Sequence, residues 1–339
     1  MRAVSFMGES ILASLEPPGR RNKGPGRAYD GQVIGFEIPS RRLEQDWQLR
    51  TRRLTLGGRT RVMGVVNITP DSFSDGGLCF LPEEAVAHAL RLLDEGADLL
   101  DLGAESTRPG SLVGDASAEV SAAEEQDRLL PVLEALLRAR PDAVVSVDTY
   151  KAATARAAVA AGAEIVNDVS GLTWDGEMAA TCAELRCGVV LMHTRGRPEQ
   201  WRSLPSLAPD EVLPLVLDGL ADSLKTAARA GIAGEAIVLD PGYGFGKRLG
   251  ENFSLLARQA ELLALARPLL AGLSRKSFLA KTLARLPAYR GDVGVEARET
   301  ASVAALVTAI LHGASIVRVH QVKAAVEAAA IADAVLSLG

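Results

Sequence analysis

The stretch that decides the fold is Val62-Met-Gly-Val-Val-Asn-Ile-Thr-Pro-Asp-Ser-Phe-Ser-Asp-Gly-Gly77. Its first half is apolar and rich in valine, which is typical of a buried β-strand. The strand ends at Asn67, and most of the residues that follow are Thr, Pro, Asp, Ser and Gly, which favour a surface loop. A buried strand that ends in an amide and opens into a polar loop is typical of one corner of an active site. It is equally typical of an ordinary strand followed by a turn.

The same pattern recurs along the rest of the chain, where short apolar runs that predict strands alternate with amphipathic segments that predict helices. The predicted strands are 62–67, 99–103, 143–148, 164–168, 188–193, 236–240, 269–274 and 315–320. The predicted helices are 82–95, 117–139, 151–161, 176–185, 209–230, 251–266, 297–312 and 322–337. Glycine commonly ends a helix in the left-handed conformation, and four of these helices are followed by Gly96, Gly162, Gly231 and Gly313.

Eight strand–helix units predict an α/β protein with the (β/α)8 TIM-barrel architecture. A doubly wound open sheet is the alternative. We favour the barrel because the units number eight and because no glycine-rich phosphate-binding turn follows the first strand. Residues 47–61 alternate polar and apolar around Gly57-Gly58, which predicts an N-terminal β-hairpin that plugs the bottom of the barrel. We therefore assign residues 46–339 to the barrel.

Residues 1–45 do not fit this pattern. Residues 17–27 are rich in Pro, Gly and basic side chains, which cannot bury a core. We interpret residues 1–45 as a flexible N-terminal extension. An over-called start site and a small folded piece around residues 33–38 are the alternatives.

Composition narrows the class of protein. Apolar residues make up 48% of the chain and aromatic residues 4%, which suits helices packed around an aliphatic sheet. A net charge of −5 gives no electrostatic footprint for nucleic acid or an anionic membrane, so we expect neither as a partner. Cys79, Cys182 and Cys187 show no metal or redox spacing, which favours the reducing cytoplasm. No apolar run is long enough to span a bilayer, and the first 15 residues are too polar for a signal peptide.

Polar side chains lie at or just beyond the carboxyl ends of all eight predicted strands. They include Asn67, Arg108, Asp148, Asn167, Asp168, His193, Asp240, Lys276, Arg318 and His320. Taken singly, each can be a structural cap, an ion-pair partner or a solvated charge. In a barrel, however, these strand ends meet at one mouth, where burying so many polar groups without partners would be costly. A ligand with both hydrogen-bonding edges and anionic groups would satisfy them.

The residue types indicate what such a ligand is. Carboxylates and amides suit a heterocycle that carries ring N–H and amino donors, whereas Arg and His suit phosphates. Arg318 and His320 are two residues apart on one strand, so they share a face and predict an anion site. The sequence has no His or Cys cluster that suits structural zinc, but a Mg²⁺ ion that arrives with phosphates is compatible with it.

Seven segments together resemble dihydropteroate synthase, and their order and spacing cover roughly residues 60–339. They are residues 63–77, 105–110, 146–149, 165–168, 240–247, 274–277 and 317–320. The resemblance implies a transferase of folate biosynthesis that joins 6-hydroxymethyl-7,8-dihydropterin diphosphate to 4-aminobenzoate and releases pyrophosphate. It also implies Mg²⁺ as the cofactor, sensitivity to sulfonamides and a homodimer.

Carried over residue by residue, the resemblance implies a role for each group at the mouth. The pterin would be held by Asp148, Asn167, Asp240 and Lys276, in a pocket lined by Met192, Phe245 and Gly272. The diphosphate and its Mg²⁺ would contact Asn67, Arg318 and His320, with Asn67 as the metal ligand. The groups that would close over 4-aminobenzoate are Phe73, Ser74, Thr107, Arg108, Pro109 and Ser277. Asp148, Lys276 and Asn67 are the expected catalytic residues.

The chain departs from the family pattern at a few positions. Gln321 follows His320 where the family usually has an acid, and Tyr243 stands for a usual Phe. Thr194 and Arg195 replace a Met and a neutral polar residue. None of these departures removes a predicted contact residue. Gln321 points to the opposite face of its strand from His320, so we expect its effect on the site to be indirect.

Two other functions remain open at this point. A methyltetrahydrofolate:corrinoid methyltransferase of the same barrel class would share Asp148, Asn167 and Asp240, but it needs neither Arg318 nor His320 as a diphosphate ligand. A non-catalytic paralogue that binds pterins or associates with a partner is the second alternative.

Overall fold

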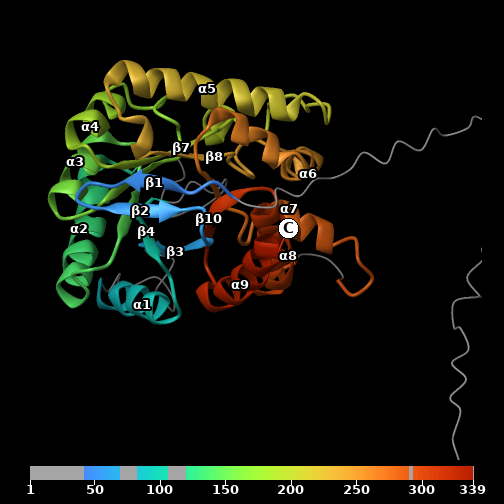
Figure 1. Ribbon diagram of the computed structural model, residues 1–339, viewed down its shortest axis with the longest axis horizontal. Helices are drawn as coiled ribbons and strands as arrows, with labels where there is room; N and C mark the ends of the chain where they lie inside the picture. The colour runs from blue at the N-terminus through green and yellow to red at the C-terminus, as the bar shows by residue number, and fades with distance from the viewer. Residues whose placement is uncertain (1–41, 69–81, 106–119, 290–292, 339) are drawn as a thin grey trace, which may run out of the picture. The chain divides into compact units, whose positions relative to one another are not determined.

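The structure is a computed structural model, and it describes residues 42–68, 82–105, 120–289 and 293–338. Eight parallel strands form a closed barrel in the order β10-β3-β4-β5-β6-β7-β8-β9. Helices surround this barrel, as Figure 1 shows. The predicted (β/α)8 barrel is therefore confirmed, and the open doubly wound sheet is wrong.

The strands begin and end close to the predicted residues. They are β3 (Arg61–Asn67), β4 (Leu99–Gly103), β5 (Val145–Asp148), β6 (Ile165–Asp168), β7 (Gly188–Met192), β8 (Ile237–Asp240), β9 (Leu269–Ala271) and β10 (Ala314–Val319). The largest error concerns β9, which was predicted to continue to residue 274. The chain leaves the ladder after Ala271, and Arg275 then adopts a left-handed backbone with φ of 61°, which no strand accommodates.

The helices also follow the predicted pattern. They are α1 (Pro82–Asp94), α2 (Ala122–Ala139), α3 (Ala152–Ala160), α4 (Met178–Leu185), α5 (Val212–Ala230), α6 (Leu249–Ala257), α7 (Ser277–Leu283), α8 (Glu299–Leu311) and α9 (Val322–Leu338). The short helix α7 was not predicted. The helix predicted at 251–266 divides into α6 and a 3₁₀ segment at Gln259–Leu265. The four predicted helix-ending glycines all have positive φ, between 88° and 111°.

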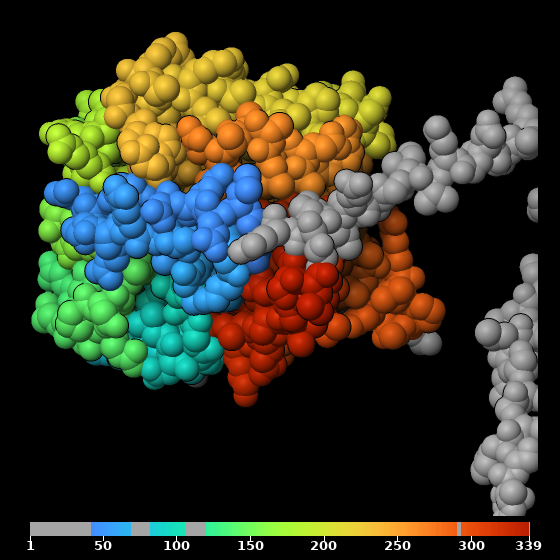
Figure 2. Space-filling view, in the orientation of Figure 1, coloured from blue at the N-terminus to red at the C-terminus, as the bar shows by residue number. Residues whose placement is uncertain are grey.

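A hairpin of β1 (Gln45–Gln48) and β2 (Arg53–Leu56) closes one end of the barrel. Its turn spans residues 49–52, where the N–H of Leu49 donates to the carbonyl of Arg52, so the predicted turn at Gly57-Gly58 is wrong. Gly57 instead lies beyond β2, with φ of 101°, and a Cβ there would come within 2.3 Å of the carbonyl oxygen of Leu43. Figure 2 shows the hairpin, in blue, across the middle of this face.

The predicted plug is present. Trp47, Leu49 and Leu56 of the hairpin segment are almost fully buried, and they pack against side chains that fill the barrel interior: Met63, Leu99, Ile165, Val190, Val238, Leu270 and Ile316. The indole N–H of Trp47 donates to the carbonyl of Ala236, which directly precedes β8. The plug therefore closes the amino ends of the strands and leaves the carboxyl ends for a site.

Arg42 fixes the start of the described chain to the barrel. Its guanidinium donates to the hydroxyl of Thr60 at 2.8 Å and to the carbonyl of Ala314 at 2.7 Å, and it pairs with Asp333 of α9. Residues 42–45, which the sequence assigned to the extension, thus contact the barrel, whereas residues 1–41 lie outside the described residues.

Two further expectations concern the chain as a whole. Cys182 and Cys187 are buried free thiols, while Cys79 lies outside the described residues. Across the described ranges, none of the helices combines the length and apolar character needed to cross a bilayer.

Candidate active site

A pocket of about 320 Å³ opens at the carboxyl ends of the barrel strands. It is lined by every predicted site residue that the structure describes: Asn67, Asp148, Asn167, Met192, Asp240, Phe245, Gly272, Lys276, Ser277, Arg318 and His320. The remaining predicted site residues, Phe73, Ser74, Thr107, Arg108 and Pro109, lie outside the described residues.

Strand register explains why these side chains meet. Asp148 on β5 lies opposite Asn167 on β6, and Met192 on β7 lies opposite Asp240 on β8. Residues paired across a parallel ladder point to the same face, so each pair projects into the barrel mouth together. The floor of the pocket therefore presents two carboxylates and one amide side by side.

Arg318 joins two carboxylates at this floor. Its Nε donates to Asp101 at 2.5 Å, and its Nη2 donates to Asp148 at 2.7 Å. Asn167 donates from Nδ2 to the same oxygen of Asp101 at 3.0 Å. Asp101 is fully buried on β4 and was not among the predicted site residues. A carboxylate in the middle of an apolar strand needs a buried partner, and that was the signal in the sequence.

Asp148 and Asp240 have perturbed pKa values. Burial raises the pKa of Asp148 to about 7; the guanidinium of Arg318 opposes this effect, and the carboxylate of Asp101 adds to it. Burial also raises the pKa of Asp240, whose carboxylate accepts the N–H of Gly242 at 2.7 Å. A ligand that donates ring N–H groups to these two carboxyl groups would favour their ionised forms.

Lys276 lies on the opposite wall, with its Nζ 4.1 Å from the centre of the Phe245 ring. Its position is fixed by the residue before it: the N–H of Arg275 donates to the hydroxyl of Ser302 at 3.0 Å, and the carbonyl of Arg275 accepts from Arg298 at 3.1 Å. These two contacts from α8 and the turn before it hold the left-handed backbone of Arg275 that directs Lys276 into the pocket.

Three polar residues near the strand ends are structural instead. Asp168 accepts the backbone N–H groups of Ser170 and Leu172, and burial raises its pKa to about 6. His193 is buried against α5, and burial lowers its pKa. Lys247 donates to the backbone carbonyls of His193 after β7 and of Gly242 and Phe245 after β8, and burial lowers its pKa to about 7. They stabilise the loops around the pocket.

The structure adds pocket residues that the sequence did not single out. Glu105 lines the pocket and pairs with Lys151, while the hydroxyl of Tyr150 donates to its carboxylate at 3.3 Å. The hydroxyl of Ser274 lies 3.1 Å from Nδ1 of His320. Trp201, from the segment after β7, forms part of the wall. No group of three or more His, Cys, Asp or Glu residues that could hold a metal occurs within the described part of the chain.

Comparison with known proteins decides the family. A family model described as "pterin binding enzyme" matches residues 63–320. The dihydropteroate synthase of Escherichia coli K12 is 42% identical over 276 residues, which cover 81% of this chain and 92% of that protein. This chain belongs to the dihydropteroate synthase family.

Solved structures of dihydropteroate synthases share the fold. The Xanthomonas albilineans enzyme with 4-aminobenzoic acid has a TM-score of 0.77 and 42% identity, and the match covers 88% of this chain and all of that one. The Yersinia pestis enzyme in a complex with a sulfonamide drug has a TM-score of 0.77 and 40% identity, and the match covers 87% of this chain and all of that one.

Two departures from the dihydropteroate synthase pattern now have a structural setting. Gln321 does not line the main pocket; its amide donates to Glu299 of α8, which also lies 3.6 Å from Nη2 of Arg275. A carboxylate is therefore still present beside strand β10, supplied by α8. Arg195 contacts the loop after β8, where its Nη1 donates to the carbonyl of Gly246 at 3.2 Å.

Proposed function

We infer that this chain is a dihydropteroate synthase, a transferase of folate biosynthesis that condenses 6-hydroxymethyl-7,8-dihydropterin diphosphate with 4-aminobenzoate. The observation that carries this inference is a single pocket that joins a floor of Asp148, Asn167 and Asp240 to a rim with Lys276 and His320. The floor suits a flat heterocycle with several donors, and the rim suits anionic groups. Family membership at 42% identity supports the same activity.

The floor residues would bind and orient the pterin. Asp148 and Asp240 offer carboxylate acceptors to ring N–H and amino groups, and Asn167 offers an amide. Arg318 uses Nε to hold Asp101 and one N–H of Nη2 to hold Asp148, so the two N–H groups of Nη1 and the second N–H of Nη2 are not used in these bonds and can meet an anion. His320, which directly follows the same strand and lies next to Ser274, would contact the diphosphate as well.

The reaction follows from these positions. The arylamine nitrogen forms a bond to the pterin methylene carbon, the bond from that carbon to the diphosphate oxygen breaks, and the nitrogen releases one proton. Positive charge develops on the methylene and negative charge on the leaving oxygens. The Asp148 carboxylate would stabilise the first, and Arg318 and His320 the second. Because an arylamine is already a nucleophile, an activating Ser-His-Asp or Cys-His arrangement is not needed.

We propose that Asn67 holds Mg²⁺. Magnesium is commonly bound by few protein oxygens together with substrate phosphates, and Asn67 supplies one amide oxygen at the end of β3 within the pocket. When bound, the ion would neutralise charge on the leaving diphosphate. The chain's own contribution is to place that amide beside the phosphate-binding rim.

We also propose that the chain works as a homodimer in the cytoplasm. Several side chains of α9 are exposed and apolar, among them Ile331, which is 70% exposed, and Val335, which is 51% exposed. Ala305 of α8 and Ala325 of α9 are by contrast buried and do not belong to this exposed face. Sedimentation equilibrium of the purified chain tests the dimer, and a monomer mass at all concentrations contradicts it.

A direct assay tests the function. Purified chain, pterin diphosphate, labelled 4-aminobenzoate and Mg²⁺ are expected to give labelled dihydropteroate and pyrophosphate, and a sulfonamide is expected to compete with 4-aminobenzoate. Tight pterin binding without any product would instead support a non-catalytic pterin-binding paralogue. Methyl transfer from methyltetrahydrofolate to a corrinoid would support the methyltransferase.

Pterin binding is expected to weaken as the pH falls below about 7. The raised pKa of Asp148 means that this carboxyl group takes up a proton in that range, and a protonated carboxyl group cannot accept from ring donors on both oxygens. Binding below the pKa should therefore release a proton. Calorimetry in buffers of different ionisation enthalpy, one pH unit above and below 7, measures both effects. Affinity and proton release that stay constant across this range contradict the assignment.

A further inference from the structure

Trp201 forms an aromatic wall beside the lysine of the pocket. Its indole meets the Phe245 ring edge to face, with ring centres 5.4 Å apart and planes at 85°, and Lys276 lies over the same Phe245 ring. Trp201, Phe245 and Lys276 thus form one column, and all three line the pocket. Trp201 follows β7, Phe245 follows β8 and Lys276 follows β9, so the column is built from loops beyond the strand ends and forms the apolar and cationic side of the site.

The chain around Trp201 fixes the orientation of the indole. A single 3₁₀ turn at Pro198–Gln200 precedes it, and its Nε1 donates to the carbonyl of Gly196 at 3.2 Å. Gly196 has φ of 69°, and a Cβ there would come within 2.3 Å of the side-chain oxygen of Gln200. The polar edge of the indole is therefore satisfied within its own segment, which leaves the ring free to pack.

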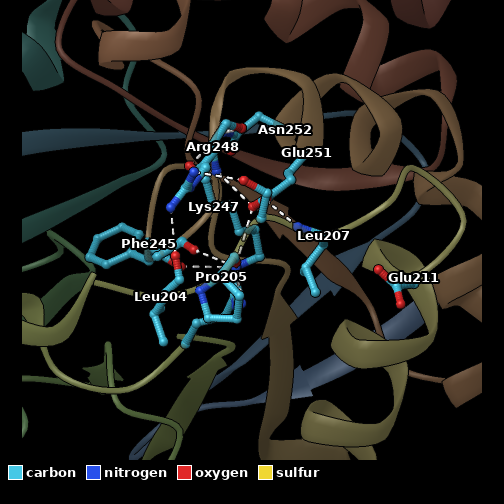
Figure 3. A network of polar contacts seen from close by, with 12 residues as sticks. Leu204, Pro205, Leu207, Glu211, Phe245, Lys247, Arg248, Glu251 and Asn252 are labelled. Carbon is cyan, nitrogen blue, oxygen red and sulfur yellow. Dashed lines mark hydrogen bonds and ion pairs between the residues drawn. The ribbon is translucent and has the colours of Figure 1, made fainter. Parts of the chain in front are cut away.

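A buried carboxylate fastens this segment to the loop after β8. Glu251, at the start of α6, accepts the backbone N–H of Leu207 at 2.9 Å and that of Arg248 at 2.7 Å (Figure 3). It also pairs with Arg195 at 3.4 Å. The guanidinium of Arg248 donates to the carbonyl of Leu204 at 2.6 Å. These contacts join the segment that carries Trp201 to the loop after β8 and the start of α6, and they hold that segment in place.

Direct packing completes the contact. Gly246, with φ of 68°, lies so close that a Cβ there would come within 2.6 Å of the Cβ of Arg195 and 3.1 Å of Cδ1 of Trp201. Any larger residue would push the Trp201 segment away from Phe245. Arg195, one of the departures from the family pattern, therefore belongs to the contact that holds Trp201 against the pocket.

We propose that Trp201 determines specificity for the arylamine acceptor, an inference that rests on the proposed synthase function. The pterin's ring donors require the acidic floor, and the resemblance places Lys276 and Phe245 beside the pterin as well. Trp201, which contacts the Phe245 ring and lines the pocket, is the part of this wall that is left for the flat ring of the acceptor. Trp201 limits the space beside that ring, and it holds the Phe245 ring against which Lys276 is placed. Trp201 acts by shape and ring contact, whereas Asp148, Arg318 and His320 stabilise the charges that develop in the reaction.

Steady-state kinetics of Trp201→Ala test this proposal. The KM for 4-aminobenzoate is expected to rise roughly tenfold, the size of effect that loss of one apolar wall commonly gives. The KM for the pterin diphosphate is expected to stay within about twofold of the wild-type value. The kcat/KM for ring-substituted 4-aminobenzoates should rise relative to that for 4-aminobenzoate itself, because the wall that excludes them is gone. Trp201→Phe keeps an aromatic wall and is expected to restore most of the affinity.

Trp174→Ala is the matched control. Trp174 packs on Tyr150 and does not line the pocket, so its loss should leave acceptor preference unchanged. If Trp201→Ala makes product with the wild-type KM and preference, or if Trp174→Ala shifts them equally, the proposal is overturned while the synthase function stands. If the wild-type protein makes no product, the proposed function itself fails. Fluorine NMR of 5-fluorotryptophan-labelled protein then decides, since only a 4-aminobenzoate-induced shift of the Trp201 signal supports the wall.

Discussion

Asp148→Asn is expected to lower turnover by about a thousandfold, which corresponds to roughly 4 kcal/mol of transition-state stabilisation. The amide has the same shape as the carboxylate, but it carries no charge to balance the positive charge that develops on the pterin methylene. It also leaves the Nη2 of Arg318 without its anionic partner. Single-turnover measurements with saturating pterin diphosphate separate this chemical defect from weaker binding.

Asp168→Asn is the control for Asp148→Asn. Asp168 is more deeply buried than Asp148 and lies on the neighbouring strand, but its carboxylate accepts the backbone N–H groups of Ser170 and Leu172 and does not line the pocket. This variant should lose stability and keep near-normal turnover per folded molecule. An Asp148→Asn variant that retains a tenth or more of the wild-type rate would remove Asp148 from the catalytic role.

Arg318→Ala is expected to lower the free energy of unfolding by about 3–5 kcal/mol, because it leaves two buried carboxylates without their cation. Asp101 is fully buried, and the side chain of Asp148 is 17% exposed, so water compensates little. The guanidinium of Arg318 holds down the pKa of Asp148, so its loss raises that pKa further above the value in the unfolded chain, and the carboxyl group then binds a proton more readily in the folded state. The variant's stability deficit should therefore narrow as the pH falls from about 8 to about 5.

Urea unfolding of wild type and Arg318→Ala at both ends of that pH range measures this deficit. The double variant Arg318→Ala with Asp101→Asn removes one of the orphaned charges and is expected to recover part of the loss. An Arg318→Ala protein as stable as wild type at pH 8 would mean that the three side chains do not form a coupled buried network.

The barrel and much of its pocket followed from local pattern. Strand ends such as Asn67, Asp148 and Asp240 stand out because an apolar run stops at a polar residue, and a parallel barrel brings all such ends to one mouth. The resemblance to one family then assigned roles to these residues. Neither step needed measured distances between strands, because a closed parallel barrel always places the carboxyl ends of its strands at the same face.

The missed features depend on contacts that local pattern does not contain. Asp101 lies inside an apolar run, and its role appears only when Arg318 is brought beside it from the far end of the chain. Trp201 lies in a long loop whose position is set by Glu251. The hairpin turn was misplaced because Gly57-Gly58 is a strong turn signal, whereas the real turn at residues 49–52 contains no glycine.

The packed interior of the barrel, covered by the hairpin at the amino ends of the strands, means that among the described residues the pocket is approached from the carboxyl ends. A ligand at the bottom of such a pocket has to bind before a ligand that lies above it. For the proposed reaction, the pterin, which is matched to the acids at the base, is therefore expected to enter ahead of the arylamine, and the joined product is expected to leave on the same side.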